Sequence, residues 1–298
     1  MANQNITRRK LLKDTTIATI GASLFLNLPV KAYGKTGNTA EKVVLMRNKN
    51  VLDNEGKVQK EVIEKMLEEA LLKLTGAGTA AAAWTEIFKP SDILGIKSNE
   101  WNKLGTPAAL EEILQEKAIS AGIKPENISI KDRGVLKDPV FQKATALINV
   151  RPMRTHAWSG VGSLIKNYIM FVDKPYAYHD DSCADPAAIW KLNNLKEKTR
   201  LNILVMLTPL FHGVGPHHFN KQYTWAYNGI IIGFDPVAVD ATGLQIIQAK
   251  RREYFGDDSQ LNPPAKHILL ADTRHHIGTA DPAKIELIAL GDQEGILI

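Results

Sequence analysis

Apolar and polar residues follow one another along this chain with two different periods, and each period predicts a different kind of element. Short apolar runs predict buried strands at 42–47, 92–97, 127–132, 146–150, 201–207, 229–234 and 284–290. Apolar residues three and four positions apart predict amphipathic helices at 58–74, 107–122 and 236–255. Strands and helices therefore alternate along most of the chain.

This alternation predicts the fold class. Strands separated by long helices are typical of an α/β protein with a mostly parallel sheet and helices on both faces. We expect a single α/β domain over residues 33–298, built as one body or as two intimate lobes. Residues 171–200 fit the alternation less well and are interpreted as an insertion.

Residues 1–32 have a different character from the rest of the chain. The segment "TRRKLLK" at 7–13 precedes an apolar stretch that ends in small residues near Ala32, which is the order of an export signal. With Arg8 and Arg9 it resembles a twin-arginine signal. That resemblance implies the twin-arginine export machinery as a partner, and a periplasmic or otherwise extracytoplasmic protein after cleavage near Ala32. A retained membrane anchor and an ordinary amphipathic helix are the alternatives.

Composition limits the possible functions. The 298 residues are 44% hydrophobic, which is sufficient for a large core. The net charge is +5, of which +4 lies in residues 1–32, so the remainder carries about +1 and lacks the footprint of a nucleic-acid-binding protein. Cys183 is the only cysteine, so this chain alone cannot supply the four cysteine ligands of an iron–sulfur cluster.

Polar side chains follow four of the predicted strands at the point where each strand ends. They are Lys97 and Asn99 at the first of these strand ends, Lys131 and Asp132 at the second, Arg151, Arg154, Thr155 and His156 at the third, and Asp235 at the fourth. In open α/β sheets, ligands bind in the crevice beyond the carboxyl ends of the strands. We therefore expect these residues to share one polar site at one edge of the sheet.

The segment "THAWSGVGSLIKN" at 155–167 has two interpretations. Its glycines fit a tight turn that lets a helix start close to the sheet. They also fit an anion cradle, in which backbone N–H groups at the helix start point at a phosphate or carboxylate. His156 belongs either to an ordinary loop or to the site. Lys166 and Asn167 lie on the flank of the predicted helix, where they face either solvent or the cleft.

Two aspartates belong to the segment "GFDPVAVDATG". Asp235 is followed by proline and is interpreted as a helix N-cap, with a role in the site as the alternative. Asp240 shares a helical face with Leu244 and Ile247, so its carboxylate is expected to be buried. A buried carboxylate needs a partner or becomes neutral, and we expect Lys97, Lys166 or a histidine in that role.

A metal site is a weaker prediction. The segment "YHDDSC" contains His179 and Cys183, and His212 follows later in the chain. Imidazole and thiolate together favour a divalent transition metal such as zinc. The alternative is a surface loop with a buried cysteine.

The dispersed motifs together resemble the family described as domain of unknown function 362 over roughly residues 90–250. The motifs are Lys97–Asn99 with Thr106, "RTH" ending at His156, Lys166–Asn167, His179, Gly213–Pro216 and Asp235–Asp240. The resemblance implies an α/β core and, in many members, an added ferredoxin-like cluster module. That module is missing from this chain.

One neighbourhood departs from the pattern of that family. Members often carry an aspartate in the strand before the glycine-proline turn, where this chain has Met206 and Thr208. His212 stands where an acidic residue is common. If that acid serves as a ligand or a base in the family, this chain either lacks the function or uses His212 for it. The resemblance brings no established reaction with it.

Two hypotheses about function follow. The first is an exported enzyme that binds a small anionic substrate or cofactor at the strand carboxyl ends, with metal assistance as an option. Its catalytic residues are His156, Lys166, His179 and Asp240, and its binding residues are Lys97, Asn99, Asn167 and Asp235. The second is a non-catalytic exported binding protein for a small anionic ligand or a redox cofactor.

Overall fold

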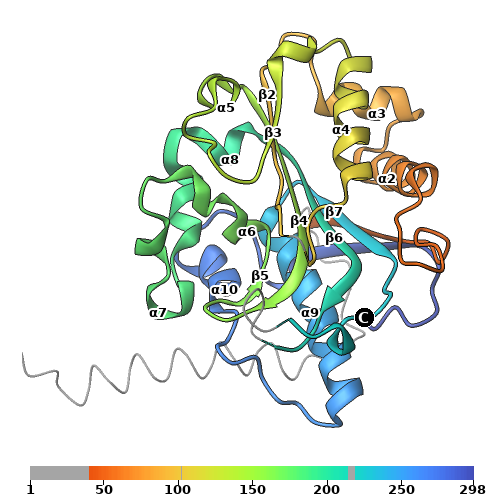
Figure 1. The fold of residues 1–298 in the computed structure, drawn as a ribbon, viewed down its shortest axis with the longest axis vertical. Coiled ribbons are helices and arrows are strands. Elements are labelled where there is room, and N and C mark those ends of the chain that lie inside the picture. The colour runs from red at the N-terminus through yellow and green to blue at the C-terminus, as the bar shows by residue number, and fades with distance from the viewer. Residues whose placement is uncertain (1–39, 102, 214–218) are drawn as a thin grey trace, which may run out of the picture.

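One sheet with the strand order β3-β2-β4-β6-β7-β1-β8 forms the centre of the protein, and β5 pairs with the end of β4 (Figure 1). The computed structural model describes residues 40–101, 103–213 and 219–298, so the predicted signal at 1–32 lies outside the described residues. The strands are β1 (Glu41–Arg47), β2 (Leu94–Lys97), β3 (Ile128–Lys131), β4 (Ala146–His156), β5 (Gly160–Gly162), β6 (Thr199–Leu210), β7 (Gly229–Gly233) and β8 (Ile285–Gly291). Each predicted apolar run forms one of these strands.

Most neighbouring strands run parallel, which confirms the predicted α/β class with a mostly parallel sheet. β7 is different, because it pairs antiparallel with both β6 and β1. The short β5 also pairs antiparallel, with the last residues of β4. The carboxyl end of β7 therefore lies at the sheet edge opposite to the carboxyl ends of β2, β3 and β4.

Helices cover both faces of the sheet (Figure 1). On one face α2 (Lys60–Thr75), α3 (Ala80–Ile87) and α4 (Ala108–Ser120) share a core with Ile148 and Val150 of β4. On the other face α6 (Leu164–Asn167), α9 (Pro236–Phe255) and α10 (Lys266–Thr273) share a core with Leu147 and Met153 of the same strand. Successive side chains of a strand point to opposite faces, so β4 contributes to both cores.

Short helices connect these layers. They are α5 (Pro139–Lys143), α7 (Asp180–Cys183), α8 (Leu195–Lys198), η1 (Pro125–Asn127), η2 (Tyr168–Phe171), η3 (Pro175–Tyr178), η4 (Pro186–Asn194), η6 (Lys221–Tyr223) and η7 (Pro282–Lys284). Within 171–200, η4 packs on α6 and α10, and α7 also packs on α10. None of the helices in the described ranges is both long and apolar enough to cross a membrane.

β4 is much longer than its predicted apolar run, and this decides where the site lies. The strand continues from Val150 to His156 because it pairs with β6 and then with β5. Its polar residues at 151, 154 and 155 are buried rather than placed in a loop. The site is therefore built partly inside the sheet layer and not only beyond a strand end.

Candidate functional site

The base of the site is a buried lysine at the end of β2. Lys97 Nζ donates to Ser98 O (2.6 Å), to Asp132 Oδ1 (2.9 Å) and to Asn167 Oδ1 (3.4 Å). Burial lowers the pKa of Lys97 to about 8, against the opposing effect of Asp132. Burial raises the pKa of Asp132, but the charge and the hydrogen bond of Lys97, together with the Glu100 backbone and Arg151, bring the net pKa below the usual value. The two side chains form a buried ion pair.

Three asparagines extend this contact across the sheet. Asn167 Nδ2 donates to Lys97 O (3.1 Å) and to Asn149 Oδ1 (2.9 Å). Asn149 Nδ2 in turn donates to Asn202 Oδ1 (3.2 Å). Buried amide groups need such partners, so this chain of hydrogen bonds holds α6 against β2, β4 and β6. Asn167 thus turns towards the sheet, not towards solvent.

Arg151 lies on the same face of β4 as Asn149, two residues further along. It is 5% exposed, and its Nε has no hydrogen-bond partner within the described residues. Burial lowers its pKa to about 10, with Asp132 and Asp240 acting in the opposite direction. A Cβ atom on Gly162 would lie 2.6 Å from Arg151 Nη2, so the guanidinium packs directly against the β5 backbone. Arg151 is a buried cation with hydrogen-bonding capacity left over.

Arg154 is the second buried arginine of β4. Its Nη2 donates to Asn99 Oδ1 (2.8 Å), and its guanidinium lies 4.7 Å from the ring centre of Trp101. Its Nε has no partner among the described residues. Burial, followed by the charge of Arg151, lowers its pKa to about 8. Asn99 therefore joins the site by orienting an arginine.

Lys166 is buried on α6 and has an unusual partner. Its Nζ lies 3.4 Å from Cys183 Sγ, and no carboxylate forms an ion pair with it among the described residues. Burial, together with the charge of Arg151, lowers the pKa of Lys166 to about 8, against the opposing effect of Cys183. Cys183 is fully buried, so the amine and the thiol form an enclosed pair.

Two histidines border this pair. Trp158 N–H donates to His156 Nδ1 (3.2 Å), and the Trp158 ring lies 4.6 Å from the His179 ring. Burial and then the charge of Lys166 lower the pKa of His156 to about 2 and that of His179 to about 4. Both imidazoles are therefore neutral at pH 7. Trp158 itself is 49% exposed, so this group connects the buried amine with the surface.

Asp240 explains the glycine segment before α6. Its Oδ1 accepts from Leu164 N–H and its Oδ2 from Ile165 N–H, both at 2.9 Å. The amides at the start of α6 do cradle an anion, and that anion is this carboxylate. Burial raises the pKa of Asp240 to about 6, although these amides, the Ser163 hydroxyl and Arg151 lower it. The expectation of a lysine or histidine partner is corrected, because the hydrogen bonds come from the backbone.

A histidine from α10 completes the interior. His267 Nε2 lies 3.0 Å from Ser163 Oγ, and His267 Nδ1 has no partner among the described residues. Burial and the charge of Lys166 lower the pKa of His267 to about 3. Asp240 and His267 meet through Ser163. This order differs from a Ser-His-Asp triad, in which the carboxylate contacts the imidazole.

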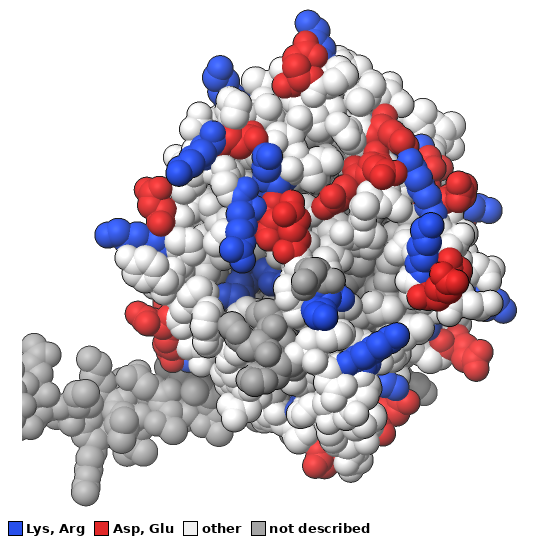
Figure 2. All heavy atoms as spheres, viewed as in Figure 1, with Lys and Arg blue, Asp and Glu red and all other residues white. Residues whose placement is uncertain are grey.

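We call Lys97, Arg151, Arg154 and Lys166 the cation cluster. These four side chains are at most 5% exposed, and two buried carboxylates, Asp132 and Asp240, accompany them. Figure 2 shows lysine and arginine atoms at the bottom of a hollow, where Figure 1 shows α6 and β5 in the same view. Positive charge therefore exceeds negative charge in this interior, an arrangement that a bound anion would stabilise.

Comparison with known proteins gives one match. Residues 105–245 match the family model described as Domain of unknown function (DUF362). This region of the chain is therefore similar to the DUF362 family. No curated protein and no solved structure matches. The DUF362 region contains three members of the cation cluster, from β4 and α6, whereas Lys97 precedes it.

One residue of the DUF362 motifs lies apart from the cation cluster. Asp235 follows β7, and the antiparallel direction of β7 puts it at the opposite edge of the sheet. Its Oδ1 accepts from Val237 N–H and its Oδ2 from Thr279 N–H, both at 2.7 Å. The expectation that four strand ends deliver polar residues to one edge is corrected for this strand. Asp235 caps α9.

The predicted metal ligands are in different surroundings. His212 Nδ1 lies 3.2 Å from Arg251 Nη1 in an aromatic group with Tyr223 and Phe255. Cys183 faces Lys166, and His179 faces Trp158. Across the residues that the structure describes, no three His, Cys, Asp or Glu side chains are grouped to hold a metal ion. Metal binding by these residues stays a prediction.

The sequence interpretation left several residues of the site unassigned. They are Asn149, Ser163, Asn202 and His267, whereas Arg151 and Arg154 are among the polar residues expected at the strand ends but without a specific role. A signal existed for the two asparagines, because each interrupts an otherwise apolar strand. Arg151 follows Asn149 at a spacing of two and so shares its face. No local pattern marks His267, which lies 104 residues from its partner Ser163.

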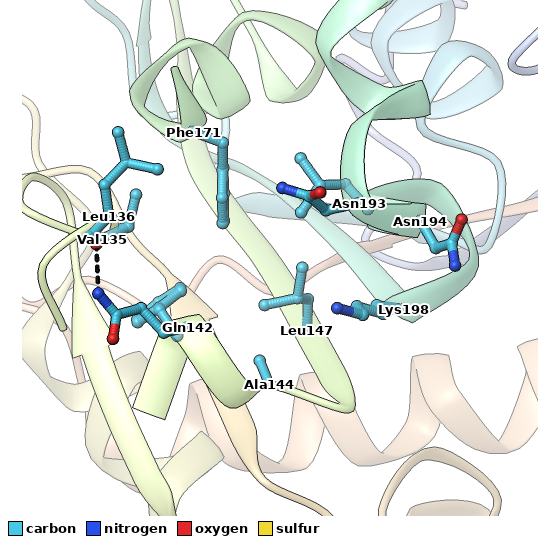
Figure 3. Close-up of a pocket in the computed structure, with 11 residues that line it drawn as sticks. Val135, Leu136, Gln142, Ala144, Leu147, Phe171, Asn193, Asn194 and Lys198 are labelled. Carbon is cyan, nitrogen blue, oxygen red and sulfur yellow. Dashed lines mark hydrogen bonds between the residues drawn. The ribbon is translucent and has the colours of Figure 1, made fainter. Parts of the chain in front are cut away.

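A separate pocket of about 470 Å³ lies near the start of β4. Its apolar wall includes Leu136, Leu147 and Phe171, and Lys198 points into it (Figure 3). Gln142 on its rim donates to Leu136 O (2.7 Å). None of its lining residues belongs to the cation cluster, so the two places are distinct.

Proposed function

We propose that this protein binds a small anionic substrate, a carboxylate or phosphate, at the cation cluster. The observation that carries the proposal is Arg151, a buried guanidinium whose Nε has no hydrogen-bond partner among the described residues. Buried charges in proteins are normally paired, and guanidinium groups bind carboxylates and phosphates in a fork geometry. An anion would supply the missing partner and offset the repulsion from Arg151, which adds to the effect of burial in lowering the pKa of Arg154 and Lys166.

Titration calorimetry on the mature chain, residues 33–298, tests this binding with phosphate, lactate and succinate as probes. We expect Arg151→Gln to lower the affinity for the best-bound probe about tenfold or more, equivalent to ~1.4 kcal/mol of binding free energy. Arg251→Gln is the matched control, because Arg251 is also buried and donates to Phe211 O (3.1 Å) outside the cluster. If no probe binds, or if both variants lose affinity equally, the proposal is wrong.

The groups beside the cluster favour an enzyme over a passive binding protein. An amine, a thiol and two neutral imidazoles lie together next to the proposed anion, and such groups perform nucleophilic and acid–base steps. Mass spectrometry of small molecules released from the purified protein, with and without incubation, compares the two functions. If wild type converts the released molecule during incubation and Lys166→Ala does not, the protein is an enzyme. A ligand that both proteins retain intact supports a binding protein.

We further propose export through the twin-arginine route. The support is the segment with Arg8 and Arg9 before an apolar stretch, which lies outside the described residues. Replacing both arginines by lysine keeps the charge and removes the guanidinium pair. We expect the double variant to stay unprocessed in the cytoplasmic fraction, while wild type appears shortened by cleavage near Ala32. Equal processing of both proteins would contradict export by this route.

A further inference from the structure

Two buried lysines of the cation cluster differ in their partners. Lys97 Nζ forms three hydrogen bonds to oxygen atoms, including the carboxylate of Asp132. Lys166 Nζ has Cys183 Sγ as its hydrogen-bond partner among the described residues. In this contact Lys166 Nζ donates to Cys183 Sγ (3.4 Å), and a sulfur atom is a weaker acceptor than an oxygen atom, so it holds an ammonium group less firmly. Lys166 is thus the lysine whose surroundings accept the deprotonated form.

The neighbouring charge acts in the same direction. Arg151 lies close enough to disfavour a second cation at Lys166, and burial removes the water that would solvate one. A lysine amine in a desolvated site beside another cation is a nucleophile towards carbonyl carbon. Arg151 meanwhile has capacity for an acid group. The two side chains together match a ligand that carries both a carbonyl and an acid.

His156 provides a hydrogen-bond donor beside this amine. Its Nδ1 accepts from Trp158 N–H, so in the neutral ring Nε2 carries the proton. Burial keeps the ring neutral, and the nearby charges, which include Arg151 and Arg154, act in the same direction. A neutral imidazole N–H can polarise a carbonyl oxygen without adding charge to a site that already has excess cations.

We propose that Lys166 forms an imine with the carbonyl carbon of a small oxo acid whose carboxylate is held by Arg151. This inference rests on the proposed anion binding at the same site. The lone pair of Nζ attacks the carbonyl carbon and forms a C–N bond. The carbonyl oxygen leaves as water, taking one proton from the amine and one from solvent, and the product is a protonated C=N group. The step needs no oxidant or reductant.

Reductive trapping tests the imine. The mature protein is incubated with pyruvate or with 2-oxoglutarate in the presence of cyanoborohydride, which adds hydride to an imine carbon and fixes the adduct. Peptide mass spectrometry then locates it. We expect one reduced adduct, on the peptide that contains Lys166. The peptide that contains Lys97 is the internal control, because that lysine is buried but ion-paired. Adduct spread over surface lysines, or on Lys97 equally, overturns the proposal.

Two further measurements separate the inference from the proposed function. Lactate has no carbonyl, so its binding to wild type reports anion binding without the imine. Lys166→Arg removes the nucleophilic amine and should lose the adduct. The thermal unfolding midpoint of Lys166→Arg shows whether this variant folds. If it does not fold, the comparison of the Lys166 and Lys97 peptides within wild type still tests the imine. If lactate binds but the oxo acids give no adduct, the imine proposal is wrong and the proposed anion binding is retained. If lactate does not bind and no adduct forms, the imine proposal and the proposed anion binding are both wrong.

Discussion

The guanidinium of Arg151 lies against the backbone at Gly162, where an added Cβ would be 2.6 Å from Nη2. A β4 arginine and a β5 glycine are therefore a matched pair. Gly160 is also required, because its φ of +71° is a left-handed conformation and Pro263 O lies 2.6 Å from its Cβ position. The glycines of this segment make room for a side chain and for backbone, whereas the anion cradle is formed by the Leu164 and Ile165 amides and is occupied by Asp240.

Gly162→Ala should displace the Arg151 guanidinium. We expect the affinity for the best anionic probe to fall about tenfold, ~1.4 kcal/mol, in titration calorimetry. Overpacking should also lower the free energy of unfolding by about 1–3 kcal/mol. Gly78→Ala is the control, since nothing lies within 4 Å of its Cβ position. Unchanged anion affinity in Gly162→Ala would show that Arg151 does not hold the ligand.

Asp132→Asn should leave the buried ammonium of Lys97 without its counter-charge. Breaking one partner of a buried ion pair costs about 3–5 kcal/mol in the free energy of unfolding. Chemical denaturation monitored by circular dichroism measures this loss. Glu69→Gln breaks the exposed contact with Lys65 and should cost less than about 1 kcal/mol. Similar small losses in both variants would mean that Lys97 is solvated or neutral in the folded state.

Asp240 should make stability fall as pH rises. Its pKa is raised from 3.8 to about 6, mainly by burial, so the folded protein binds the proton more tightly than the unfolded chain. This contribution is fully present below pH 4 and is lost as pH rises through 6. Asp240→Asn cannot titrate, so the difference in unfolding free energy between wild type and variant should shrink by roughly 1–3 kcal/mol across that window. A constant difference would contradict the raised pKa.

His267 should have the opposite dependence on pH. Burial, with the charges of Lys166 and Arg151, lowers its pKa from 6.5 to about 3. The neutral folded ring therefore stabilises the protein fully above pH 6.5, and this contribution is lost as pH falls towards 3. His267→Gln retains an acceptor for Ser163 and removes the titration. Thermal unfolding of both proteins from pH 7 down to pH 4 should show a steeper decline for wild type. Parallel declines would contradict this assignment.

The sequence by itself determined the elements and much of their local chemistry. The alternation of apolar residues located every described strand except β5, and the three long helices, because periodicity reports directly which side chains face a core. The aspartate–proline start of α9 was also readable, since an N-cap depends only on its own first turn. The sequence also placed Lys97 and His156 near strand ends, and they are the last residues of β2 and β4.

Tertiary structure decided which of these residues meet. Strand direction depends on pairing between distant segments, and the antiparallel β7 moves Asp235 away from the cluster. Register pairs Lys97 with Asn149, and this puts Asn149 and Arg151 on the lysine's face of the sheet. The partners of Asp240 and Lys166 come from segments 76 and 17 residues away. Such contacts are set by packing of whole layers, and no local period in the chain records them.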